Sequence, residues 1–210
     1  MGYYPARSAI VAAWGREEDK LPKRFFHPEE ESTVLEYLLD AVWTVADAIY
    51  VIFRREPSLK LIEAISTFGV KIIIENRNPT IVSSLLMGFK ASRSEHCLVL
   101  RENLPFLKPS VLHILFEFAK GYDAALPKWS NGRLEPFLAV YRRKSFITVA
   151  SRLQSENDLL SVVDNLYSIR YVSVEDEIKP LDPDLESFFT IDSEEDLAKA
   201  REKVTLKYKI

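Results

Sequence analysis

The chain has 210 residues, of which 47% are hydrophobic and 28% are charged, and its formal net charge is -3. This length suits a single domain with a large core, which we expect to span residues 1–210. The charge balance gives no sign of a nucleic-acid partner, and no apolar run approaches the ~20 residues of a membrane span. The first 20 residues lack the pattern of a signal peptide, and one cysteine excludes an intrachain disulfide, so a cytoplasmic protein without a membrane partner is predicted.

Strand and helix patterns alternate through the first 121 residues. Ser32 is the predicted N-cap of the first helix. The strands carry continuous Val, Ile and Leu runs, which are typical of strands covered on both faces. The sequence therefore predicts an α/β protein with a doubly wound, mainly parallel sheet flanked by helices. The predicted strands are residues 8–14, 48–54, 70–75 and 96–100, and the predicted helices are residues 32–45, 57–69, 79–92 and 108–121.

The pattern changes after Gly121. Residues 123–129 and 135–143 read as two strands around a turn at Asn131-Gly132. An amphipathic helix is predicted at 159–168 and an edge strand at 169–176. The chain then reaches a helix capped by Ser193, with acidic residues in its first turn.

Ligands of an open parallel sheet bind beyond the carboxyl ends of its strands. Four predicted loops lie there, at residues 14–24, 54–56, 76–80 and 101–107, and Asp192 marks a fifth polar tip. The first loop is basic, which suits a triphosphate, but a solvated surface remains the other interpretation. The loop lacks the glycines of a P-loop or a dinucleotide fingerprint.

Five segments, in order, resemble a known family: "IVAAWG…K", "SSLLMGFKA", "LVLRENLPFL", "EPFLAVY" and "FFTIDSEEDL". They resemble the nucleotidyltransferases of the molybdopterin-guanine dinucleotide biosynthesis protein A type, over about residues 8–200. The resemblance implies a Rossmann-like fold of the nucleotide-diphospho-sugar transferase kind. It also implies an enzyme that binds GTP and Mg²⁺, transfers GMP to the terminal phosphate of molybdopterin and releases pyrophosphate. Other proteins of molybdenum cofactor biosynthesis are the implied partners.

The resemblance also assigns roles to residues. The first loop of the family is Gly-rich, whereas this chain keeps Gly15 and has Trp14 where the family has a second glycine. Lys20 and Lys23 are the candidates for the catalytic cations, without a choice between them. The residues expected to bind the nucleotide are Ala13, Gly15, Lys23, Ser84, Arg101 and Glu135, so Lys23 is a candidate for both roles.

The metal positions depart from the family in one place. Asn103 occupies the position of a metal-binding aspartate, and Asp192 occupies the second metal position. An amide oxygen is a neutral ligand, so Asn103 supplies no charge. Glu102 is adjacent, but successive strand side chains point to opposite faces, so it substitutes only where the strand has ended. The resemblance therefore requires Asp192 to lie close to residues 101–103.

Several alternatives stay open. The protein is an active guanylyltransferase, a divergent member that binds a nucleotide or a partner protein, or a nucleotidyltransferase for another acceptor, such as a sugar phosphate or cobinamide phosphate. Each site residue also has a structural interpretation. Glu135 pairs with Arg133 or a neighbouring lysine, and Asp192 caps the last helix, a role that Ser193 could share. Ser84 lies on a helix surface, and Arg101 is a solvated strand end.

Overall fold

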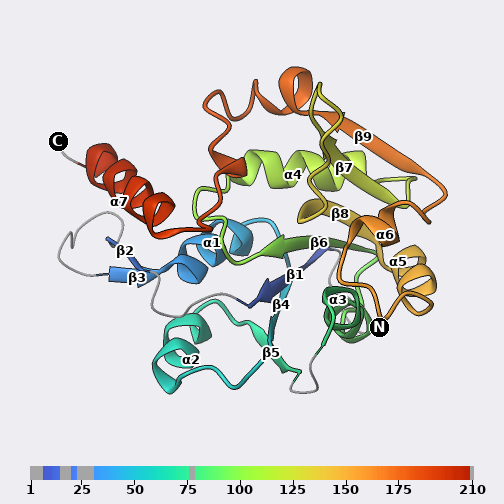
Figure 1. Ribbon diagram of the computed structural model, residues 1–210, viewed down its shortest axis with the longest axis horizontal. Coiled ribbons are helices and arrows are strands. Elements are labelled where there is room, and N and C mark those ends of the chain that lie inside the picture. The colour runs from blue at the N-terminus through green and yellow to red at the C-terminus, as the bar shows by residue number, and fades with distance from the viewer. Residues whose placement is uncertain (1–6, 15–19, 23–30, 76–78, 209–210) are drawn as a thin grey trace.

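The computed structural model describes residues 7–14, 20–22, 31–75 and 79–208. Its centre is a seven-stranded sheet in the order β5-β4-β1-β6-β8-β7-β9, which confirms the predicted mainly parallel α/β fold (Figure 1). β8 is antiparallel to β6 and β7, and the other four pairings are parallel. The strands are β1 (Arg7–Ala13), β4 (Ala48–Phe53), β5 (Lys71–Ile74), β6 (His96–Arg101), β7 (Ala124–Lys128), β8 (Leu138–Arg142) and β9 (Ile169–Ser173).

Helices cover both faces of the sheet. One face packs against α1, α2 and α4, and the other packs against α3, α5 and α6. Among the residues described, no helix has the length and apolarity needed to cross a membrane. The helices are α1 (Val34–Trp43), α2 (Leu59–Ser66), α3 (Ile81–Ala91), α4 (Pro109–Phe118), α5 (Arg143–Ala150), α6 (Leu160–Val163) and α7 (Glu194–Tyr208), with a π-helical turn at Val174–Ile178 and a 3₁₀ turn at Glu186–Phe188.

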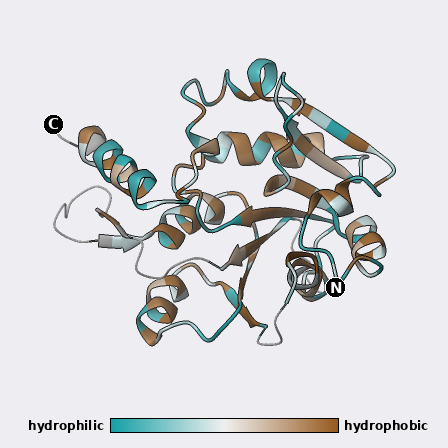
Figure 2. Ribbon diagram, in the orientation of Figure 1, coloured by the Kyte–Doolittle hydropathy of each residue, from teal (hydrophilic) through white to brown (hydrophobic). Residues whose placement is uncertain are grey.

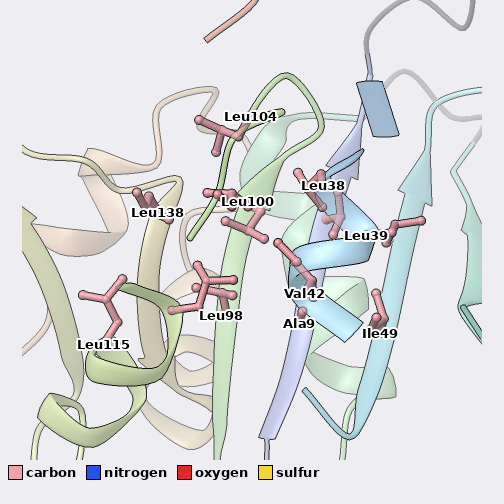
Figure 3. Close-up of a cluster of buried hydrophobic side chains, with 14 of the residues drawn as sticks. Ala9, Leu38, Leu39, Val42, Ile49, Leu98, Leu100, Leu104, Leu115 and Leu138 are labelled. Carbon is pink, nitrogen blue, oxygen red and sulfur yellow. The ribbon is translucent and has the colours of Figure 1, made fainter. Parts of the chain in front are cut away.

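The two-sided burial explains the unbroken apolar runs of the strands. In β6, Leu98 and Leu100 join the core under α1 and α4, whereas Cys97 and Val99 join the core under α3. The central strands are accordingly hydrophobic along most of their length (Figure 2). Figure 3 shows part of the core under α1 and α4, with Leu38, Leu39 and Val42 of α1 on one side and Leu115 of α4 on the other.

Helix α3 lies unusually close to the sheet because of a glycine. A Cβ atom added to Gly88 would stand 2.6 Å from Ile10 Cγ2 and 3.0 Å from Ile52 Cδ1. Both distances are below ordinary van der Waals contact, so only glycine permits this approach. The close approach at Gly88 packs α3 directly on β1 and β4.

Several predicted boundaries need correction. Thr33, and not Ser32, caps α1, because Glu36 at the third helical position reaches back to the Thr33 backbone N–H at 2.7 Å. The strand predicted at 135–143 begins at Leu138, and the helix predicted at 159–168 is regular only over Leu160–Val163. The edge strand ends at Ser173, where the π-helical turn begins. Helix α5 was not predicted.

A small two-stranded sheet was also not predicted. β2 (Lys20–Pro22) pairs antiparallel with β3 (Glu31–Thr33), and α7 packs against it (Figure 1). Their shared core includes Leu21, Leu197 and Val204. The predicted single domain over residues 1–210 stays a prediction.

Candidate functional site

The carboxyl ends of the central strands form one edge of the sheet. Parallel pairing brings Ala13 beside Phe53, Phe53 beside Ile74, and Ala12 beside Arg101. Because β8 runs in the opposite direction, the residues that precede Leu138 reach the same edge. The predicted loops therefore meet where ligands of such sheets bind.

Asn103 and Asp192 meet at this edge, although 89 residues separate them in the sequence. Asn103 Nδ2 donates a hydrogen bond to Asp192 Oδ1 at 2.8 Å, and the Ile191 backbone N–H donates to the Asn103 carbonyl oxygen at 3.0 Å. Thr190 Oγ1 donates to the other oxygen of Asp192 at 2.7 Å. The structure therefore contains the proximity that the metal-site prediction requires.

Both members of the pair are held by buried neighbours. β6 ends at Arg101, and the turn that carries Asn103 is followed by a buried segment at 104–107. On the other side, Ile191 is 6% exposed and packs in the core shared with α7. Ser193 Oγ, and not the Asp192 carboxylate, accepts the Asp196 N–H at 3.2 Å, so the helix-capping interpretation of Asp192 is wrong. The Asp192 carboxylate is exposed and directed at Asn103.

The segment before Asp192 is fixed by a buried carboxylate. Glu186 is 6% exposed and accepts hydrogen bonds from Lys108 Nζ at 2.8 Å and Lys203 Nζ at 3.4 Å. The Phe189 ring packs against Phe106, with centroids 5.5 Å apart. These contacts join residues 186–189 to α4 and α7, and they set the position from which Asp192 projects.

The pair fits a hard divalent cation. Asn103 Oδ1 is buried and has no hydrogen-bond partner within the described part of the chain, while Asp192 contributes a carboxylate. An unpaired buried acceptor beside a carboxylate suits a cation that prefers oxygen ligands. Within the described ranges, no group of three or more His, Cys, Asp or Glu could hold a metal. Two protein oxygens, completed by phosphate and water, are a common arrangement for Mg²⁺.

Glu135 is engaged by its own hairpin. Its carboxylate lies 2.9 Å from Arg133 Nη2 and accepts a hydrogen bond from Trp129 Nε1 at 2.7 Å. The pairing with Arg133 is therefore confirmed. The Trp129 ring makes an edge contact with Phe188, at a centroid distance of 5.1 Å, so this hairpin touches the segment that leads to Asp192. Nucleotide binding by Glu135 stays a prediction.

Ser84 is fully buried, so its interpretation as a helix-surface residue is wrong. Its hydroxyl donates a short hydrogen bond to Glu75, the residue after β5, and Ser83 Oγ lies 3.3 Å from the same carboxylate. This bond holds Glu75 at the carboxyl edge. Whether Ser84 also contacts the nucleotide stays a prediction.

Of the other predicted residues, Ala13, Arg101 and Glu102 lie in the described part of the structure, whereas Gly15, Lys23 and the Lys20 side chain do not. Ala13 is the buried last residue of β1, and the Glu102 N–H donates to the Ala12 carbonyl oxygen at 3.3 Å. Arg101 is exposed at the end of β6. Lys20 lies in β2, but its side chain falls outside the described part of the structure. Gly15 and Lys23 fall outside it entirely. All their roles stay predictions.

Five residues at or just beyond the ends of adjacent strands line this edge, on the face covered by α3. They are Glu75, Arg54, Trp14, Arg101 and Phe137. The Arg54 guanidinium lies over the Trp14 ring, 3.8 Å from its centroid, and the Arg101 guanidinium lies over Phe137 at 4.0 Å. Sequence reasoning missed Arg54, Glu75 and Phe137. The available signal was that Arg54 and Glu75 are the charged last residues of the apolar strands predicted at 48–54 and 70–75, and that 54–56 was a predicted ligand loop.

Comparison with known proteins agrees with this geometry. The MobA-like NTP transferase domain matches residues 16–170. A probable molybdenum cofactor guanylyltransferase of Methanosarcina acetivorans is 31% identical over 204 residues, covering 93% of this chain and 90% of that protein. The corresponding protein of Methanosarcina mazei is 32% identical over 213 residues, covering 95% and 94%.

Solved structures share the fold. Molybdopterin-guanine dinucleotide biosynthesis protein A from Archaeoglobus fulgidus has a TM-score of 0.68 at 24% identity, covering 94% of this chain and 99% of that one. A 4-diphosphocytidyl-2C-methyl-D-erythritol synthase from Anaerococcus prevotii has a TM-score of 0.69 at 16% identity, covering 95% and 96%. Because the names of these two proteins give different products, the fold alone does not choose a substrate. By its sequence match over most of its length, the chain belongs to the MobA-like NTP transferase family.

Proposed function

We propose that the protein transfers GMP from GTP to the terminal phosphate of molybdopterin, releasing pyrophosphate. Two relatives at 31% and 32% identity carry the name of this activity, and both are covered over nearly their whole length. The observation that supports it best is the Asn103–Asp192 pair at the carboxyl edge, with an Asn103 oxygen that no described residue pairs with. We also propose that it works in the cytoplasm, with other molybdenum cofactor biosynthesis proteins as partners.

In this proposal, Asp192 and Asn103 hold Mg²⁺. The ion, when bound, supplies positive charge for the α-phosphate and the departing pyrophosphate. Thr190 and the Asn103 amide fix the direction of the Asp192 carboxylate through their hydrogen bonds. Because Asn103 is neutral, this pair brings one negative charge, and the triphosphate must supply more of the balance than in a site with two carboxylates.

Cationic side chains orient the phosphates. Arg101 is exposed, lies two residues before Asn103, and is held against the Phe137 ring, so its guanidinium is available for a phosphate oxygen. Lys20 and Lys23 are the proposed partners of the triphosphate on the other side. An acceptor phosphate oxygen then attacks the α-phosphorus, a new P–O bond forms, and the bond to pyrophosphate breaks.

A ligand-binding screen tests this function. Melting temperatures are measured with GTP, ATP, CTP and UTP, with and without Mg²⁺. At 100 times the dissociation constant, a ligand adds about 2.7 kcal/mol, which raises the melting temperature of a chain this size by about 5–10 °C. We expect this shift for GTP with Mg²⁺.

Two variants identify the metal residue. Asp192→Asn should remove the Mg²⁺-dependent part of the shift. Asp184→Asn is the matched control, because it removes the same charge from an exposed residue in the same region. Absence of any shift at millimolar GTP would contradict the proposal and favour a member that binds a partner protein.

A further inference from the structure

Arg54 occupies a defined position at the carboxyl edge. It follows the last residue of β4, and the Glu75 N–H donates to the Phe53 carbonyl oxygen at 2.9 Å, so Glu75, the residue after β5, lies beside it. On the other side, the pairing of Ala13 with Phe53 places Trp14 beside Arg54. Arg54 therefore stands between an aromatic ring and a carboxylate.

The Arg54 side chain is held at two points although the residue is exposed. Its Cζ lies 3.8 Å from the centroid of the Trp14 ring, and its Nη2 donates to the Pro79 carbonyl oxygen at 3.2 Å. Fixing a long side chain in one conformation costs about 2 kcal/mol of rotamer entropy. The two contacts offset this cost and hold the Arg54 guanidinium in one place. The Trp14 ring is itself half-buried against the core under α3. One face of the Arg54 guanidinium thus packs on the Trp14 ring, which is itself fixed by the core.

The charge around Arg54 favours an uncharged ring over a phosphate. Glu75 is half-buried, and the hydroxyls of Ser83 and Ser84 hold its carboxylate at this edge. A triphosphate beside Glu75 would meet a like charge. The cation site at Asn103 follows β6, two strands away from β4, which is about 10 Å at ordinary strand spacing. A nucleotide lying across the end of β1 could therefore reach Arg54 with its base and the cation site at Asn103 with its phosphates.

Trp14 provides an independent observation. Its Nε1 is buried and has no hydrogen-bond partner among the residues that the structure describes. A buried donor without an acceptor is costly, at about 1–3 kcal/mol. An oxygen or ring nitrogen of a bound ligand would satisfy it.

From these contacts we infer that Arg54, held flat on Trp14, is the surface on which the base of the donor nucleotide stacks. The inference rests on the proposed function and names the residue that binds its substrate's base. An arginine plane stacks on aromatic rings through both dispersion and cation–π attraction. A purine, with its larger ring system, gains more from this surface than a pyrimidine.

The test compares a ligand that has a base with one that does not. Dissociation constants for GTP and for inorganic triphosphate, each with Mg²⁺, are measured by calorimetry for the wild type, Arg54→Ala and Arg54→Lys. Both variants should bind GTP about 10-fold or more weakly, because one base stack is lost. Inorganic triphosphate should bind all three proteins equally. Lysine should not restore GTP binding, since it keeps the charge but has no plane. Arg55→Ala, which removes the same charge from the adjacent exposed residue, should bind GTP like the wild type.

Three results would overturn the inference: unchanged GTP affinity in Arg54→Ala, an equal loss for GTP and inorganic triphosphate, or recovery in Arg54→Lys. The last two would make Arg54 a phosphate-binding residue. These outcomes leave the proposed function intact, provided the wild type binds GTP with Mg²⁺. If the wild type binds no GTP, both the function and the inference fail. Melting curves of each variant without ligand confirm that it is folded.

Discussion

Substituting Asn103 by aspartate tests the metal site in two ways, through the stability of the protein without Mg²⁺ and through its response to Mg²⁺. In the structure, the Asn103 amide donates a hydrogen bond to the Asp192 carboxylate at 2.8 Å. Asn103→Asp replaces that donor with a second carboxylate at nearly the same place. The variant should therefore be less stable without metal and should gain more than the wild type when Mg²⁺ binds.

The size of the loss follows from the distance. Two carboxylates that relax to ~4 Å repel by about 1 kcal/mol in a water-like dielectric and about 4 kcal/mol in a partly screened one. Asp192 is exposed, so the repulsion belongs near the lower value. The lost hydrogen bond to a charged group adds about 1.5–3 kcal/mol. A total of about 2–4 kcal/mol corresponds to a melting temperature about 4–15 °C lower.

The assay is thermal unfolding of both proteins in EDTA and across a Mg²⁺ titration. Asn131→Asp is the control, since its oxygen still accepts the Arg133 N–H and no carboxylate is bonded to it.

The reasoning would be refuted by equal stability of Asn103→Asp and wild type in EDTA, or by an equal response of the two to Mg²⁺. A further consequence concerns turnover. If the missing carboxylate limits the reaction, Asn103→Asp with Mg²⁺ should transfer GMP faster than the wild type. Unchanged or slower transfer would show that the amide is not the limiting feature.

Three other predictions concern the fold that supports the site. Gly88→Ala should destabilise the protein by about 1–3 kcal/mol in urea unfolding, because its Cβ would stand 2.6 Å from Ile10 Cγ2; stability equal to the wild type would contradict the close approach of α3. Burial raises the pKa of the Cys97 thiol to about 12, so this single cysteine should resist a thiol reagent at pH 8 until the protein unfolds, and rapid labelling of the native protein would contradict its burial. Glu186→Gln should cost about 1–3 kcal/mol by weakening the contacts to Lys108 and Lys203, and it should lower Mg²⁺ affinity through the Asp192 segment; unaltered stability and affinity would show that this contact does not position Asp192.

The sequence predicted the central fold well because the signal was strong there. Strands β1, β4, β5 and β6 carry apolar runs, and a helix is the next element after β4, β5 and β6, whereas β2 and β3 stand between β1 and α1. The missed elements had weaker signals. β2 and β3 are three residues each, and α5 carries a mixed polar pattern directly after β8 with no capping side chain. Tertiary contacts, such as those of α7 with β2, decide such elements.

The candidate site was predictable only in part. The family resemblance placed Asn103 and Asp192 together, and the structure joins them by a hydrogen bond. Neither composition nor periodicity could give the edge row of Arg54, Trp14 and Glu75, since it depends on the register between strands distant in the sequence. Likewise, the burial of Ser84 depends on how closely Gly88 lets α3 approach the sheet.

Product analysis tests the central claim most directly. The purified protein is incubated with GTP, Mg²⁺ and molybdopterin, and the products are identified by mass spectrometry. The account predicts a guanine dinucleotide of molybdopterin, one pyrophosphate released for each GMP transferred, and a rate at least about 10-fold lower in Asp192→Asn but not in Asp184→Asn. No dinucleotide from a folded wild type that binds GTP, or wild-type rates in Asp192→Asn, would contradict it.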